Sequence, residues 1–197
     1  MKVLSVGKSR TAPILLHAAR EGKDAVGYRL SEGEYRALGS PAVGDTLPEE
    51  IAERMAAYDA RHRARSAAAR ILSFGENNRA MLIRKLRARG FSATLSETVA
   101  DEMCERGYIR ESDQLERAVL SAAKKLWGAR RIADALAAKG FDRGEALACI
   151  DRLTAAGEID FSAIRRELIA KKLPADADYA ARRALLYRYG HGSSFED

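Results

Sequence analysis

The sequence repeats itself with a period of 50 residues. Leucine recurs at positions 86, 136 and 186, and glycine recurs at positions 90, 140 and 190. A period of this length is typical of stacked supersecondary units, each of which buries its apolar face on its neighbours. The register therefore predicts a tandem-repeat protein. It also extends to three further pairs, Arg89 with Lys139, Phe91 with Phe141 and Asp101 with Asp151.

The repeated part of the chain lacks the strongest helix breaker. The four prolines lie at positions 13, 41, 48 and 174, so none falls between residues 49 and 173. Glycines recur where a helix can end with a positive φ. We therefore expect three helices in each unit, the third unit lacking its last one. The predicted helices are 64–76, 78–89 and 95–106, then 112–127, 130–139 and 143–156, and finally 161–172 and 176–189.

The first 50 residues follow a different pattern. Short β-tolerant runs at 2–6, 13–17 and 25–30 are separated by polar and glycine-containing turns, which predicts a small β-meander. Ser31 and Glu34 have the spacing of a capping box, so a short helix should follow and reach about Leu38. The expected fold is mainly α, with tandem three-helix repeats and a small N-terminal β-containing extension. The expected domains are 1–50, the meander and short helix; 51–109, a linker helix and the first repeat; 110–159, the second repeat; and 160–197, the incomplete third.

Positive charge is concentrated in the repeats. Residues 1–60 carry 8 basic and 9 acidic side chains, whereas residues 61–197 carry 26 basic and 19 acidic ones. Such an excess favours polyanions or acidic protein surfaces as partners. A proteome-wide bias towards arginine and alanine is the alternative explanation.

Two groups of basic residues are the candidate contacts. On the helix predicted at 78–89, Leu82, Ile83 and Leu86 share one face, so Arg84 lies roughly opposite that face. No acid interrupts the basic residues of this helix. We predict that the two groups form a continuous basic strip; a solvated helix face is the alternative. The candidates are Arg79, Arg84, Lys85, Arg87 and Arg89 in the first repeat and Lys124, Lys125, Arg130, Arg131 and Lys139 in the second.

Aromatic residues are sparse and mostly adjoin glycines or helix ends, where they more often close a core than stack on bases. The best candidates for base stacking are Tyr187, Tyr189, His191 and Phe195, near the C-terminus. The same four residues would equally form an apolar edge that awaits a partner.

The residue inventory does not favour an enzyme. The three histidines, at positions 17, 62 and 191, lack metal-binding spacing, and Cys104 and Cys149 form no C-x-x-C pair. We therefore expect a non-enzymatic protein without a metal or other cofactor. No apolar run approaches the ~18 residues that a membrane span requires, and the start lacks a signal-peptide core. The expected location is the cytoplasm.

Two segments resemble the RecX family, regulators of the RecA recombinase that are built from tandem three-helix repeats. Residues 78–91, NRAMLIRKLRARGF, are similar to the signature of the first repeat in that family, and residues 128–141, GARRIADALAAKGF, resemble that of the second. There are departures, since Met81 stands where the family has an acid and the third repeat is short.

The resemblance implies a monomer that binds the RecA nucleoprotein filament in its groove, together with DNA. It would lower the ATPase and strand-exchange activities of RecA, in DNA repair, recombination and control of the SOS response. From the residues alone, the alternatives are a stand-alone DNA-binding protein that grips single- or double-stranded phosphates, or a protein-interaction scaffold.

Overall fold

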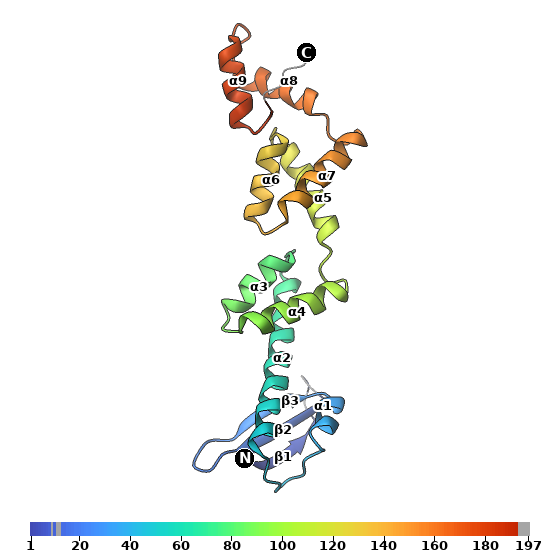
Figure 1. Cartoon of the computed structure of the whole chain (residues 1–197), viewed down its shortest axis with the longest axis vertical. Helices are drawn as coiled ribbons and strands as arrows, with labels where there is room; N and C mark the ends of the chain where they lie inside the picture. Colours follow the sequence, from blue (N-terminus) through green and yellow to red (C-terminus); the bar gives the residue numbers. More distant parts are fainter. Residues whose placement is uncertain (9, 11–12, 193–197) are drawn as a thin grey trace. The chain divides into compact units, whose positions relative to one another are not determined.

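The computed structural model describes all residues except 9, 11, 12 and 193–197. A small N-terminal sheet is followed by a series of helices (Figure 1). The chain divides into two compact units. Residues Met1–Gly75 and Ile83–Glu102 form the first, and residues Glu76–Leu82 and Met103–Asp197 form the second. The described part is mainly helical with one small sheet, so the predicted fold class is confirmed.

The sheet is the predicted meander. Strands β1 (Lys2–Gly7), β2 (Ile14–Ala19) and β3 (Val26–Leu30) pair antiparallel in the order β1-β2-β3. Val3, Leu16 and Leu30 are buried and pack in one cluster with Met55, which lies on the next long helix along the chain. The extension thus shares one hydrophobic core with the first turns of the long helix that follows it.

The capping box forms as predicted. Ser31 caps helix α1 (Glu32–Ala37), and its Oγ accepts a hydrogen bond from the N–H of Glu34, while the Glu34 carboxylate accepts one from the N–H of Ser31 at 2.8 Å. Nε2 of His62 lies 2.8 Å from the same carboxylate. Burial raises the pKa of Glu34, but the hydrogen bonds from Ser31 and His62 outweigh it, so the pKa lies below its usual value.

Helix α2 (Glu49–Ser73) runs for 25 residues from the extension into the first repeat. Pro48 precedes it and two glutamates occupy its first turn, where they interact favourably with the helix dipole. Arg61 and Arg65 on α2 both pair with Glu102. These ion pairs hold α2 against helix α4 (Ala93–Glu105) inside the first unit.

Short helices joined by loops make up the rest of the described chain. They are α3 (Arg79–Arg87) and α4 (Ala93–Glu105); α5 (Glu111–Ala123), α6 (Ala129–Ala138) and α7 (Arg143–Ala155); and α8 (Phe161–Lys172) and α9 (Tyr179–Arg188). The predicted helices are therefore present, mostly within a few residues of the expected ends. The exception is the helix expected at 64–76, which is the last part of the continuous helix α2 and does not begin at residue 64. The proposed boundaries between repeats at residues 109 and 159 stay a prediction.

The second helix of each repeat ends on a glycine. Gly90, Gly140 and Gly190 have φ values of 87°, 92° and 82°, in the left-handed region that glycine adopts without a Cβ penalty. After each glycine the chain turns back, so the N–H groups of residues 91, 141 and 191 bond to the carbonyl oxygens of residues 86, 136 and 186. The glycine register therefore marks one repeated helix end.

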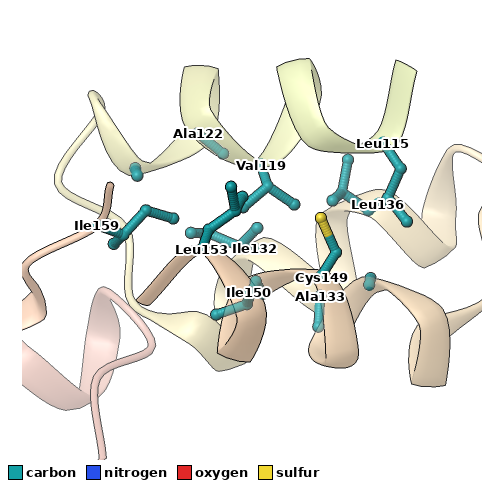
Figure 2. Close-up of a cluster of buried hydrophobic side chains, with 12 residues drawn as sticks. Leu115, Val119, Ala122, Ile132, Ala133, Leu136, Cys149, Ile150, Leu153 and Ile159 are labelled. Atoms are coloured by element: carbon teal, nitrogen blue, oxygen red, sulfur yellow. The ribbon is translucent and has the colours of Figure 1, made fainter. Parts of the chain in front are cut away.

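The second repeat shows how a unit closes its core. Leu115 and Val119 of α5, Ile132 and Leu136 of α6, and Leu153 of α7 meet in one buried cluster (Figure 2). On α6 the buried positions follow the i, i+1, i+4 spacing of one helix face. Asp142 caps α7 through the N–H of Glu145, which fixes where that helix begins.

Within the second unit, the second helices of successive repeats meet end to end. The Nδ2 of Asn78, just before α3, donates to the carbonyl oxygen of Lys139 at the end of α6, at 3.0 Å. The N–H of Gly128, just before α6, donates to the carbonyl oxygen of Tyr189 at the end of α9, at 2.8 Å. We call these two contacts the repeat joints.

None of the helices in the described part of the chain is long and apolar enough to cross a membrane.

Candidate functional site

The first group of candidate residues lies on and just after α3. Arg84, Arg87 and Arg89 are exposed, whereas Lys85 is half-buried because it adjoins the buried face of Leu82 and Leu86. Within the described residues, Arg84 and Arg87 form no ion pair. These two guanidinium groups are therefore available to an anionic partner.

Arg79 plays a different part at the start of α3. Its side chain is half-buried, and its N–H donates to Oε1 of Glu111 at 2.8 Å. A carboxylate in this place satisfies a helix N-terminus. Arg79 therefore sits at an internal contact of the second unit, beside the joint that Asn78 makes.

The second group does not gather at one place. Lys124 and Lys125 follow α5 and Arg130 and Arg131 begin α6, but Lys139 lies at the far end of that helix. Ten residues at 1.5 Å each separate the two ends by about 15 Å. Whether these cations continue the α3 group as one strip stays a prediction.

The start of α6 is engaged by the third repeat. Nη2 of Arg130 donates to the carbonyl oxygen of Tyr187 at 2.8 Å, and Nη1 of Arg131 donates to that of Arg188 at 3.4 Å. The two arginines thereby satisfy carbonyl groups at the end of α9, which has no further helical turn to accept. Both arginines therefore hold the start of α6 against the end of α9 as well as carrying positive charge.

Aromatic rings interleave with these cations. The Arg131 guanidinium lies 4.5 Å from the ring centroid of Trp127 and 5.2 Å from that of Tyr189. The Arg130 guanidinium lies 4.1 Å from the Tyr187 ring, and Nζ of Lys125 lies 5.3 Å from that of Trp127. The sequence indicated the basic residues and the tyrosines separately, and the joint brings them together. Phe195 lies outside the described residues.

His191 closes this joint. It is buried, its Nε2 lies 3.1 Å from the carbonyl oxygen of Leu126, and its ring meets that of Phe161 edge-on. Leu126 has a φ of 61°, unusual for a residue with a Cβ. Burial lowers the pKa of His191 against the opposing effect of the hydrogen bond to Leu126, and repulsion from Arg165 adds to the lowering, so the ring favours its neutral form. His191, which the sequence offered as a candidate for base stacking, is instead buried and binds the α5–α6 loop.

Several other basic side chains already have partners. Ion pairs of this kind on the surface reduce the local excess of positive charge without adding much stability. Such pairs in the described part of the second unit include Arg117 with Glu76, Arg143 with Asp134, Arg152 with Glu116 and Lys171 with Glu167.

The described residues hold no group of three or more histidine, cysteine or acidic side chains that would bind a metal ion. Cys149 is buried, and desolvation raises the pKa of its thiol, which makes it a poor nucleophile at neutral pH.

The fold defines a class, the helical-repeat proteins, whose members commonly bind their partners through extended surfaces. Within that class, the chain belongs to the RecX family of regulatory proteins. It is 35% identical over 130 residues to the regulatory protein RecX of Ectopseudomonas mendocina, a match that covers 63% of this chain and 84% of that protein. It is 30% identical over 149 residues to the regulatory protein RecX of Pseudomonas syringae pv. tomato, a match that covers 76% of this chain and 87% of that protein.

Solved structures agree on the fold. A crystal structure of a regulatory protein RecX superposes with a TM-score of 0.72 over 98% of this chain and 95% of the other, at 16% identity. The crystal structure of RecX from Lactobacillus salivarius superposes with a TM-score of 0.53, over 66% of this chain and 84% of the other, at 17% sequence identity. No model of a known protein family matches the chain.

Proposed function

We propose that this protein regulates the RecA recombinase by binding the RecA–DNA filament, and that it lowers ATP hydrolysis and strand exchange without catalysing a reaction itself. Membership of the RecX family carries this proposal, because the relatives named regulatory protein RecX match this chain over most of their length.

The charge of α3 supports a role for this helix in the contact. Arg84, Arg87 and Arg89 are exposed, and no acid occurs between residues 77 and 96. Guanidinium groups pair well with phosphates and carboxylates, both of which a protein–DNA filament presents. We assign these three arginines to the filament contact and Lys124, Lys125 and Lys139 to supporting contacts with the same partner.

The test is single-strand-DNA-dependent ATP hydrolysis by RecA with this protein titrated in, beside an anisotropy titration on the same DNA without RecA. Loss of hydrolysis at substoichiometric protein, where the bare DNA is little bound, is the expected result. Inhibition that appears only when the bare DNA is saturated would instead identify a stand-alone DNA-binding protein that competes for phosphates.

A pair of variants locates the contact. Arg84→Glu with Arg87→Glu changes the charge by four units on exposed positions and should raise the inhibitory concentration about tenfold or more, since each lost charge-assisted contact costs about 1.5–3 kcal/mol. The control is Lys23→Glu with Arg36→Glu, the same change on exposed positions of the N-terminal extension. Equal effects of the two pairs would contradict the assignment to α3.

A further inference from the structure

We propose that the joint between the α5–α6 loop and the end of α9 binds single-stranded nucleic acid, with the ring of Tyr187 stacked on an unpaired base and the surrounding cations on the phosphates. This site goes beyond regulation of RecA, because its binding requires no recombinase. We call it the joint patch; it comprises Lys124, Lys125, Trp127, Arg130, Arg131, Tyr187 and Arg188.

The charge of the joint patch calls for an anion. The two segments that meet here, residues 124–131 and 182–191, contain seven basic residues and no acidic one. Within the described part of the chain, none of the five basic side chains of the patch forms an ion pair. Cations held this close repel one another, and a polyanion that replaces their counterions relieves the repulsion.

Tyr187 distinguishes a nucleic acid from other polyanions. Its side chain is 62% exposed, yet it is held in place, because the Arg130 guanidinium stacks on the ring and also donates to the Tyr187 carbonyl oxygen. A ring that is already ordered loses little entropy when a ligand stacks on it. An acidic peptide would satisfy the cations and leave the ring unused.

The ring also favours single strands over duplexes. Bases in a duplex are stacked on one another, whereas an unpaired base has a free face for an aromatic side chain. Trp127 and Tyr189 are each covered by the Arg131 guanidinium and are half-buried, so Tyr187 is the ring of this patch that a base reaches most readily.

Trp127 supplies a built-in reporter, because it is the only tryptophan in the sequence and contacts two cations of the patch. The full-length protein is titrated with oligodeoxythymidylate of about 15 nucleotides, near the upper site size of small single-strand binding modules. Anisotropy of the labelled oligonucleotide and emission of Trp127 are followed together. Both should change over the same range of concentration; an unchanged emission at saturation would overturn the proposal.

A comparison of two ligands, one with bases and one without, measures how much the bases contribute to binding. An abasic deoxyribose-phosphate strand of the same length and charge should bind the wild-type protein about tenfold more weakly than oligodeoxythymidylate, in the range expected for stacking one base. Equal affinities would show phosphate binding alone and overturn the proposal. So would polyglutamate of equal charge that binds as tightly as the oligonucleotide.

The contribution of the ring is isolated by variants. Tyr187→Ala keeps the carbonyl group that Arg130 uses and should weaken oligodeoxythymidylate binding about tenfold, while Tyr187→Phe should stay within about twofold. The matched control is Tyr179→Ala, a tyrosine at the other end of α9 with the same 62% exposure. Equal losses of oligodeoxythymidylate affinity in Tyr187→Ala and Tyr179→Ala would refute stacking. So would a loss of duplex affinity in Tyr187→Ala that equals its loss of oligodeoxythymidylate affinity. Circular dichroism verifies the fold, and if Tyr187→Ala is unfolded, the abasic comparison on the wild-type protein decides.

Discussion

Gly140 packs directly on Ala80 of the preceding repeat: a Cβ on Gly140 would lie 2.7 Å from the Cβ of Ala80, closer than side chains tolerate. Gly190 has the same relation to Arg131, whose backbone and Cβ leave no space for a side chain. The glycine after α6 thus also lets α6 approach the start of α3, and the glycine after α9 lets α9 approach the start of α6. One residue type serves helix termination and repeat stacking at once.

This dual role predicts unequal costs for the same substitution. Gly90→Ala and Gly140→Ala both place alanine at a left-handed φ, which costs about 1–2 kcal/mol. Gly140→Ala must in addition displace the start of α3, for about 1–3 kcal/mol more, whereas a Cβ on Gly90 has no heavy atom within 4 Å. Thermal unfolding followed by circular dichroism measures both variants, and equal shifts in Tm would contradict a tight joint at Gly140.

Asn78 should not tolerate replacement by aspartate. The residue is 1% exposed; its Oδ1 accepts from the N–H of Met81 at 2.8 Å, and its Nδ2 donates to Lys139. Aspartate preserves the helix cap but turns a carboxylate towards a carbonyl oxygen. Asn78→Asp should therefore lose about 1–3 kcal/mol in urea unfolding, the cost of an unsatisfied buried polar group.

The control for Asn78 is Asp178→Asn. Asp178 occupies the equivalent place before α9, where its exposed side chain caps the helix through the N–H of Ala181 at 2.7 Å. Asparagine and aspartate are equally good caps, so Asp178→Asn should change stability by less than about 0.5 kcal/mol. A neutral Asn78→Asp would show that the joint does not need the amide.

Glu102 should govern part of the acid unfolding of the first unit. Hydrogen bonds from Arg65, and then from Arg61, lower the pKa of Glu102 to about 2, against the opposing effect of burial. Because the pKa is lower in the folded state, the stabilisation is complete above the ordinary value of 4.5 and is lost as the pH falls from 4.5 towards 2. Measurements of Tm from pH 2 to pH 7 should show this loss.

Glu102→Gln replaces the titrating carboxylate with a neutral amide and so removes its pH-dependent contribution to stability. The variant should be less stable than wild type at pH 7 and should show a shallower dependence of Tm on pH between 4.5 and 2. Glu105→Gln, an exposed position on the same helix, should leave the dependence as it is. Parallel curves for wild type and Glu102→Gln would exclude Glu102 as the titrating group.

Much of the secondary structure follows from local signals. The capping box at Ser31 and Glu34, the spacing of the prolines and the glycine register each describe a preference of a few neighbouring residues, and such preferences survive in the folded chain. The ends of helices were less well predicted: the helix expected to run to Trp127 stops at Ala123, because Leu126 adopts a positive φ that His191 secures from far along the chain.

The candidate site was only partly predictable for the same reason. Exposed positions such as Arg84 follow from helical periodicity, since Leu82 and Leu86 fix which face is buried. Nothing near Arg130 in the sequence indicates that its guanidinium will lie on Tyr187, because that contact joins residues in different repeats.

By itself, the sequence determined the repeat, the helices that compose it, the family and the excess of positive charge, since each is written in residue type and spacing. Only the tertiary structure decided which cations are free and which are engaged. Arg84 and Arg130 are both arginines on short helices, but one faces outward from its helix and the other satisfies the end of α9. The physical reason is that unpaired carbonyl groups at a helix end draw donors from wherever the fold brings them, and the fold is a property of the whole chain.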